Sequence, residues 1–419
     1  MPPLTSPGSM AAPATTKPGG KGRILFLDQQ SWRSGAQKVL ETVLDAVRPD
    51  CEPWVAFPDR GDFSRKLEEK GIGTLTYPLG SYRSGQKSWA EGMGFAARSL
   101  VCGLKLARHI LQSNTRLVYV NGPRCLPAGV LAARLTGRPL LFHLHLTLCR
   151  KPEVRLVAFL SRYVTATIAC SHAAAEPILR ARPSLSRQTH VLYNPVPRHT
   201  PAAAVALVEP RPSDCLTLGM IGRITERKGH MQLLNALSRL SPGLQRQVQL
   251  LIVGAPAPGN SADMAYARRL RDCAAKLHLH QVTWAGYQAD PNPFYASLDA
   301  LLQPSLHQAG EGMPLAVLET FHFGVPVIAA RTGGIPEIVR EGVNGLLVPA
   351  GDEVALAQAL QQFLSNPPLR DRLRAGARST LTDQFSVEGF QCRIRSLIRE
   401  LAGPQIPGKA PLTQGEAAA

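Results

Sequence analysis

The chain alternates short apolar runs with stretches of helical periodicity, and it does so on both sides of a segment rich in Pro and Ala. The runs of the first half are RILFLD (23–28), LVYVN (117–121), PLLFHLH (139–145), TATIACS (165–171) and THVLYNPV (189–196). Apolar residues between these runs recur at helical spacing, as in QKVLETVLDAV (37–47). Strands that alternate with helices predict an α/β fold, with a parallel sheet covered on both faces.

The second half repeats this alternation. Its apolar runs include CLTLGMIG (215–222), QVQLLIVG (247–254), VPVIAA (325–330) and GLLVPAG (345–351). A length of 419 residues also suits two domains. We therefore predict two doubly wound Rossmann-like domains, at 21–197 and 214–385, joined by a linker at 198–213. A helix at 386–402 ends the fold, and a leader (1–20) and a tail (403–419) are expected to be disordered.

Positive charge is concentrated in the first domain. Residues 1–200 hold 27 Lys and Arg against 12 Asp and Glu, whereas residues 201–419 hold 20 against 18. Arg98, Lys105 and Arg108 lie on one side of a helix predicted near 92–111. Such a surface attracts polyanions or an acidic membrane, and a solvated basic face is the default alternative. No zinc-finger, basic-zipper or ribonucleoprotein motif appears, so no nucleic acid partner is expected.

Several functional classes lack their motifs. The chain contains no C-x-x-C and no paired Cys/His spacing, so we expect no zinc site. It also contains no strand-to-helix G-x-G-x-x-G, no G-x-x-x-x-G-K-[ST] and no G-x-S-x-G. No apolar stretch approaches the roughly 20 residues of a spanning helix, and the first 20 residues lack the apolar core of a secretory signal. We expect a cytoplasmic protein whose membrane contact, if any, is peripheral.

Three segments carry candidate binding residues. In GRITERKGH (222–230), Arg223 and Lys228 follow an apolar strand, where two cations can converge on a diphosphate; two solvent-exposed basic residues are the alternative.

In EGMPLAVLE (311–319), Glu311 precedes a helix, Pro314 suits its first turn and Glu319 lies inside it. The N–H groups of Gly312, Met313 and Leu315 can meet phosphate charge, and the carboxylates can accept sugar hydroxyls. A salt-bridged helix face is the alternative there.

Gly35, in the loop before the first helix, allows close approach of a ligand or forms a plain tight turn.

These segments, in this order, resemble the donor site of glycosyltransferase family 4, whose members are retaining enzymes of the GT-B fold. FGVPVIAARTGGIPEIV follows the E-x7-E element, and SGAQKVL, LFHLH, IACS, LYNPV and QPS are weaker echoes, so the resemblance spans about residues 23–400. It implies two domains that face a central cleft, with the C-terminal helix returning to the first domain. It also implies a bacterial enzyme of surface-polysaccharide assembly.

The resemblance implies a role for each matched residue. Arg223 and Lys228 would contact the donor diphosphate in place of a metal. Glu311 would hold hydroxyls of the transferred sugar, and Glu319 those of the ribose. His145 would lie near the anomeric carbon, although a core histidine is the alternative, and Gly35 would approach the phosphates.

The resemblance also implies substrates. The donor would be a nucleotide sugar, with UDP as the first expectation and GDP or ADP as alternatives, and the acceptor would be lipid-linked or a glycan. A UDP-sugar 2-epimerase and a catalytically inactive GT-B binding subunit are the competing functions.

Overall fold

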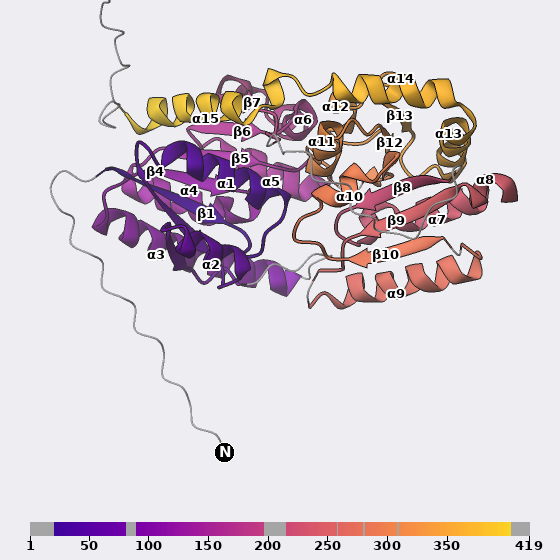
Figure 1. Ribbon diagram of the computed structural model, residues 1–419. Coiled ribbons are helices and arrows are strands. Elements are labelled where there is room, and N and C mark those ends of the chain that lie inside the picture. Colours follow the sequence, from indigo (N-terminus) through magenta and orange to yellow (C-terminus); the bar gives the residue numbers. More distant parts are fainter. Residues whose placement is uncertain are drawn as a thin grey trace, which may run out of the picture.

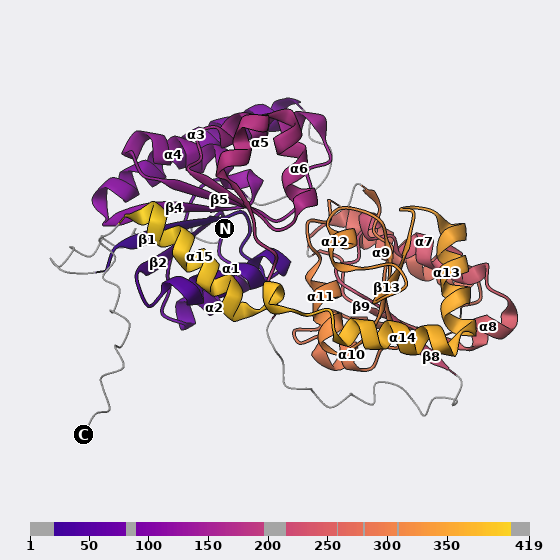
Figure 2. The same cartoon turned by 90° about the horizontal axis from the view of Figure 1, so that it is seen from above.

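The computed structural model describes residues 21–80, 89–196 and 215–403, apart from residues 258, 280, 308 and 309. The predicted leader (1–20) and linker (198–213) lie outside these residues, as does all but the first residue of the predicted tail (403–419). Two lobes, one at each end of the molecule, are joined along one side by the C-terminal segment (Figure 1; Figure 2).

The first lobe is built on a parallel sheet of order β3-β2-β1-β4-β5-β6-β7. Its strands are β1 (Arg23–Asp28), β2 (Glu52–Phe57), β3 (Gly73–Thr76), β4 (Thr115–Asn121), β5 (Leu140–Leu144), β6 (Ala166–Ala169) and β7 (Thr189–Val191). Its helices are α1 (Gly35–Val47), α2 (Asp62–Glu69), α3 (Trp89–Gln112), α4 (Leu126–Thr136), α5 (Lys151–Ser161) and α6 (His172–Ala181), with 3-10 turns η1 (Pro123–Cys125) and η2 (Pro183–Gln188). The apolar runs of the sequence become its central strands, which are buried on both faces.

The second lobe has a parallel sheet of order β10-β9-β8-β11-β12-β13. Its strands are β8 (Leu216–Ile221), β9 (Val248–Val253), β10 (Val282–Gly286), β11 (Ala300–Gln303), β12 (Val327–Ala330) and β13 (Gly345–Val348). Its helices are α7 (His230–Ser238), α8 (Pro242–Arg246), α9 (Ser261–Lys276), α10 (Asn292–Ala296), α11 (Leu315–His322), α12 (Ile335–Ile338), α13 (Glu353–Ser365) and α14 (Pro367–Arg378), with 3-10 turns η3 (Glu226–Lys228) and η5 (Asp383–Phe385). The predicted α/β class with two doubly wound domains is confirmed.

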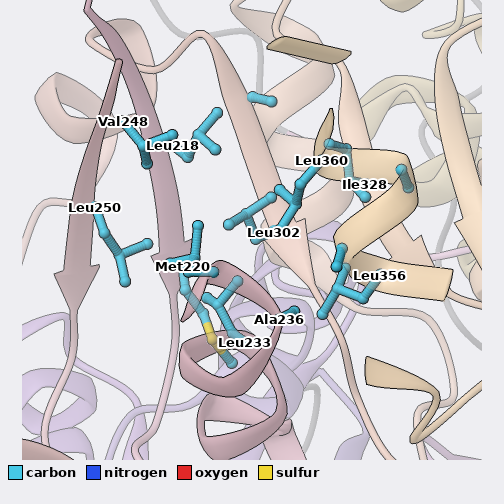
Figure 3. Close-up of a cluster of buried hydrophobic side chains, with 14 of the residues drawn as sticks. Leu218, Met220, Leu233, Ala236, Val248, Leu250, Leu302, Ile328, Leu356 and Leu360 are labelled. Atoms are coloured by element: carbon cyan, nitrogen blue, oxygen red, sulfur yellow. The ribbon is translucent and has the colours of Figure 1, made fainter. Parts of the chain in front are cut away.

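Apolar side chains fill the space between each sheet and its helices. In the second lobe, Leu218 and Leu250 from neighbouring strands contribute to the same buried cluster as Leu233 of α7 and Leu356 of α13 (Figure 3). All four are less than 2% exposed. Burial of such a side chain contributes about 1.5–3 kcal/mol, so this layer holds the second sheet and its helices together.

The last helix, α15 (Val387–Ala402), leaves the second lobe and packs on the first (Figure 2). Its buried residues Phe390, Ile394 and Ile398 recur every four positions and belong to the apolar cluster beneath α1. Arg399 Nη2 donates at 2.8 Å to Oδ2 of Asp50, which lies three residues after the end of α1. The predicted return of the C-terminal helix to the first domain is confirmed, and the helix ties the two lobes together.

Parallel strands end at one edge of a sheet, and ligands of such folds bind outside that edge. The loop after β5 in the first lobe contacts the loop of the second lobe that follows β11. Of the residues predicted from the sequence, Glu311 lies in the loop after β11 and His145 in the loop after β5, whereas Arg223 and Lys228 follow β8.

Candidate active site

Glu311 lies in the loop before α11 and is joined to Lys228 at the end of η3. Lys228 Nζ donates to Glu311 Oε1 at 2.6 Å, and Ser305 Oγ donates to the same oxygen at 2.8 Å. Glu311 is 8% exposed and Lys228 is half-buried. Among the described residues no donor reaches Glu311 Oε2. The fold therefore brings these two predicted residues together and leaves one carboxylate oxygen available to a sugar hydroxyl.

Glu319, inside α11, is joined to the other lobe. Lys38 Nζ of α1 donates to Glu319 Oε1 at 2.6 Å, and Tyr295 Oη of α10 donates to Oε2 at 2.8 Å. Burial and the neighbouring Glu319 raise the pKa of Tyr295 well above its usual value, so the phenol keeps its proton. Pro314 caps the helix rather than lying in its first turn, because α11 begins at Leu315.

The loop that carries Glu311 is held by side chains of the first lobe. Thr147 Oγ1 donates to the carbonyl oxygen of Glu311 at 3.0 Å, and Ser171 Oγ donates to that of Gly312 at 2.9 Å. Asn194 Nδ2 donates to the carbonyl oxygen of Met313 at 3.0 Å. Three successive carbonyl groups of one lobe thus accept hydrogen bonds from the other. The position of Glu311 depends on how the lobes dock.

A second contact between the lobes involves Glu337 of α12. Its two carboxylate oxygens accept from the backbone N–H groups of His172 and Ala173 at 2.9 and 2.8 Å. These donors open α6 of the first lobe, where a negative charge is favourable. Glu337 therefore caps a helix that belongs to the opposite domain.

Glycine allows the loops to approach this closely. A Cβ at Gly312 would lie 2.3 Å from the carbonyl oxygen of His145 and 2.6 Å from Cys170 Sγ, both in the first lobe. A Cβ at Gly333 would lie 1.8 Å from the carbonyl oxygen of Glu311, and its φ of +53° also favours glycine. Side chains at these two positions would displace the Glu311 loop.

Arg223 follows β8 and is half-buried. Within the described part of the chain it forms no hydrogen bond or ion pair, so the structure does not join it to Lys228, Glu311 or Glu319. Burial raises the pKa of Asp263 at the start of α9, and the attraction of Arg223 acts against this rise. The guanidinium of Arg223 is therefore near α9, and its N–H groups are available to a ligand.

The sequence predicts that Gly35 lies in the loop before the first helix. In the structure it is instead the first residue of α1. It is exposed and faces the opposite lobe, because a Cβ there would lie 3.7 Å from Leu315 Cδ1. The fold thus brings the glycine loop to the start of the helix that carries Glu319.

His145 follows β5 and contacts the Glu311 loop through its backbone. Its Nε2 lies 2.6 Å from Asn121 Oδ1, and its ring centroid is 3.8 Å from that of His143. Burial lowers the pKa of His145 to about 3, so the imidazole is neutral near pH 7. His145 is a half-buried residue of the domain interface, whereas His143 is the fully buried histidine.

A cavity of about 280 Å³ lies between the lobes at the Glu319 end of the site. Its walls include Lys38, Glu41 and Lys70 of the first lobe and Leu315 and Glu319 of the second. Glu41 accepts ion pairs from Arg33, Lys66 and Lys70 at 2.9, 2.7 and 3.3 Å. The first domain therefore lines this cavity between the lobes with several cationic side chains.

The sequence interpretation missed several residues that shape this site. Ser171, Asn194 and Ser305 all lie in segments that echo the family pattern, namely IACS, LYNPV and QPS, and that signal could have identified them. Lys38 was not predicted as a site residue. Its contact with Glu319 depends on the placement of the two domains, which no local pattern encodes. Among the described residues no group of three His, Cys, Asp or Glu side chains could hold a metal ion.

Two family models match the chain and between them cover most of it. Residues 34–199 match the model described as Glycosyltransferase Family 4, and residues 208–380 match the model described as Glycosyl transferases group 1. The first model covers the first sheet from β2 to β7, without β1, and the second model covers all six strands of the second sheet.

Relatives and solved structures are similar to parts or all of the chain. The lipopolysaccharide core biosynthesis glycosyltransferase LpsE of Rhizobium meliloti is 35% identical over 43% of this chain and 48% of its own length. A D-inositol 3-phosphate glycosyltransferase of Stackebrandtia nassauensis is 37% identical over 40% of this chain and 38% of its own. The chain therefore matches about half or less of these relatives. The crystal structure of Anabaena HepE in complex with UDP-glucose has a TM-score of 0.73 at 24% identity and covers 90% of this chain and 99% of its own.

Proposed function

Because the chain belongs to the family 4 glycosyltransferases of the GT-B fold, we propose that it transfers a sugar from a nucleotide-sugar donor to a lipid-linked or glycan acceptor in cell-surface glycan assembly. The observation that carries this proposal is the meeting of Lys228 and Glu311, 83 positions apart, in a loop held by the opposite domain. Similarity to LpsE, a lipopolysaccharide core enzyme, supports the acceptor class.

In this proposal the donor lies against the second domain. Arg223 and Lys228 neutralise the diphosphate and stabilise the charge that develops on it as it leaves, so no metal is needed. Glu311 accepts from hydroxyls of the transferred sugar, and Glu319 accepts from those of the ribose. Donor binding replaces the ion pairs that Lys228 and Lys38 now make, because the same carboxylates serve both partners.

Retention of anomeric configuration is proposed on family grounds, with attack on the face that the leaving diphosphate vacates. Burial lowers the pKa of His145 to about 3, so its neutral imidazole is a weak base near pH 7. This supports a role for the leaving phosphate, and not for the imidazole, in taking the proton of the acceptor hydroxyl. A proton nuclear magnetic resonance assay of the product linkage would separate retention from inversion.

The test of transfer is release of nucleoside diphosphate. UDP-, GDP- and ADP-sugars are first screened by thermal shift, since a ligand at one hundred times its Kd stabilises the fold by about 2.7 kcal/mol. The best donor is then mixed with lipid-linked sugars or core oligosaccharides. Release that requires an acceptor supports the transferase. Isomerisation of the donor without acceptor would indicate the epimerase, and binding without turnover would indicate the inactive subunit.

Four alanine variants link the assay to the site: Arg223→Ala, Lys228→Ala, Glu311→Ala and Glu319→Ala. Each is expected to lower turnover while the fold remains intact. Full activity in all four would contradict the assignment.

A peripheral contact with an anionic membrane is a second part of the proposal. The outer face of α3 carries Leu100, Leu104 and Leu111, which are 54%, 51% and 69% exposed. Arg98, Lys105 and Arg108 on the same helix are also exposed. A second copy on this face would bring like charges together, whereas each cation near an anionic bilayer contributes about 1 kcal/mol. No helix in the described ranges is long and apolar enough to cross a bilayer.

Vesicle sedimentation tests this contact. The protein is expected to bind vesicles containing phosphatidylglycerol and not vesicles of phosphatidylcholine alone. Leu104→Glu should weaken this binding. Val354→Glu on α13 is the matched control, because Val354 is 50% exposed but lies in the other domain. Equal binding of both variants would rule out the α3 face, and dimerisation lost in Leu104→Glu would identify a second copy as its partner.

A further inference from the structure

A chain of buried hydrogen bonds connects Asp28, at the end of β1, to His145. Asn121 Nδ2, at the end of β4, donates to Asp28 Oδ2 at 2.8 Å, and Asn121 Oδ1 lies 2.6 Å from His145 Nε2. Asp28 is 0% and Asn121 1% exposed. Asp28 and Asn121 end β1 and β4, and His145 directly follows β5. These three strands are neighbours in the first sheet, so the sheet itself fixes the spacing of the residues.

The carboxylate of Asp28 determines the direction of every bond in this chain. Its Oδ1 accepts from the backbone N–H of Gln30 at 3.0 Å and from Gln37 Nε2 at 2.8 Å. Burial raises the pKa of Asp28 to about 6, against the opposing effect of its hydrogen bonds, so it is mainly ionised near neutral pH. An ionised carboxylate only accepts, and therefore Asn121 must present its amide N–H to Asp28.

The orientation of Asn121 then determines the protonation of His145. With its N–H turned toward Asp28, the amide turns its carbonyl oxygen toward His145 Nε2, which must carry a proton to form a hydrogen bond. His145 Nδ1 is consequently the nitrogen without a proton. It is buried, and in the described part of the chain it has no hydrogen-bond partner.

The surroundings also oppose a charge on His145. Its partner in the chain is a neutral amide and not a carboxylate, and the ring of His143 lies against it at 3.8 Å. His143 Nδ1 already lies 2.5 Å from Tyr119 Oη. Two neighbouring imidazoles in a buried position do not both ionise, since burial lowers the pKa of each.

We propose that Asp28 and Asn121 are positioning residues that hold His145 as the neutral tautomer protonated on Nε2, which keeps Nδ1 as a hydrogen-bond acceptor for a hydroxyl of the bound substrate. The role toward substrate rests on the proposed function, whereas the tautomer does not. Asp28 also accepts hydrogen bonds from Gln30 and Gln37, which flank the loop of Gly35. One carboxylate therefore fixes the position of this loop as well as the tautomer of His145.

Nuclear magnetic resonance of protein labelled with ¹⁵N-histidine tests the tautomer directly. The signal of His145 is assigned as the one lost in His145→Gln. At pH 7.5 the wild-type protein should show a proton on Nε2 and none on Nδ1. A proton on Nδ1, or on both nitrogens, would overturn the proposal without the need for a variant that folds.

Asp28→Asn provides the second arm, because it should reverse the chain. The new amide oxygen can still accept from Gln30 and Gln37, but its NH₂ group now faces Asn121. Asn121 is expected to turn, accept from residue 28 and donate to His145, which then carries its proton on Nδ1. An unchanged tautomer in folded Asp28→Asn would overturn the proposal. Asp59→Asn, in the same domain beside Ser31, is the control and should leave His145 unaffected.

Turnover connects the tautomer to substrate. Loss of the Nδ1 acceptor in Asp28→Asn should lower kcat roughly threefold to tenfold, the value of one neutral hydrogen bond. Asn121→Ala should lower kcat similarly, since it releases the imidazole. If the tautomers behave as expected but neither variant changes kcat, the substrate role fails. If no transfer is detected in the wild-type protein, the proposed function fails and the tautomer result remains.

Discussion

The substitution Gly312→Ala adds one methyl group at the contact between the two domains and should force them apart. A Cβ at this position would lie 2.3 Å from the carbonyl oxygen of His145 and 2.6 Å from Cys170 Sγ. Both atoms belong to the first lobe, and the nearer one is backbone, which cannot turn away as a flexible side chain would. Gly312 does not have the positive φ that strains other residues. Gly312→Ala therefore perturbs the domain contact by steric overlap alone.

The size of the effect follows from the cost of overpacking. Forcing an extra methyl group into a packed contact costs about 1–3 kcal/mol. If this cost falls on the docked arrangement, the ratio of docked to undocked protein drops roughly fivefold to hundredfold, and the docked population falls by up to that factor. Glu311 is held in place only in that arrangement, by Thr147 and its neighbours. We expect kcat to fall by the same factor while each domain stays folded.

The assay is the initial rate of nucleoside diphosphate release at saturating donor and acceptor, with thermal unfolding measured in parallel. Gly243→Ala in α8 is the matched control, because a Cβ there has no atom within 4 Å. Its turnover should equal that of the wild-type protein. Wild-type turnover in Gly312→Ala would refute the inference that docking of this loop is required for reaction.

Three further predictions concern charged groups. Lys228→Met should lower kcat by about 10²–10³, the usual cost of removing a donor that stabilises transition-state charge, with partial recovery in Lys228→Arg. Glu319→Gln should raise the KM for donor about tenfold with a smaller change in kcat, because ribose binding is the same in ground and transition states; an unchanged KM would contradict this. Burial raises the pKa of Asp28 to about 6 in the folded state, so the folded state binds the proton more tightly than the unfolded chain. The stability of the wild-type protein relative to Asp28→Asn should therefore increase by about 1.4 kcal/mol from pH 7 to pH 5 in denaturant titrations, whereas a difference independent of pH would refute it.

The sequence predicted both sheets because buried parallel strands are continuous apolar runs of the kind seen at 117–121 and 247–254. It missed β2 and β3, since EPWVAF and GTLT are short and contain polar, Pro or Gly residues. It also missed α2, where DFSRKLEE has few apolar residues to reveal the helical period. Local pattern identifies an element only when burial is nearly complete.

The candidate site was predictable in part. The order of GRITERKGH and EGMPLAVLE indicated that Lys228 and Glu311 belong to one site, and the fold joins them at 2.6 Å. The hydrogen bonds across the domain interface were not predictable, because they depend on the placement of two separate domains. Asp28 was also overlooked, since a charged residue after a strand usually lies in solvent, and only the sheet shows it to be fully buried.

The central claim is that two cations and two carboxylates of the second domain form one site for a nucleotide sugar. A crystal structure of the protein with bound nucleoside diphosphate tests it most directly. The account predicts diphosphate oxygens within hydrogen-bond distance of Arg223 and Lys228, and ribose hydroxyls on Glu319 in place of Lys38. Nucleotide bound elsewhere, with the Lys228–Glu311 and Lys38–Glu319 pairs still intact, would contradict it.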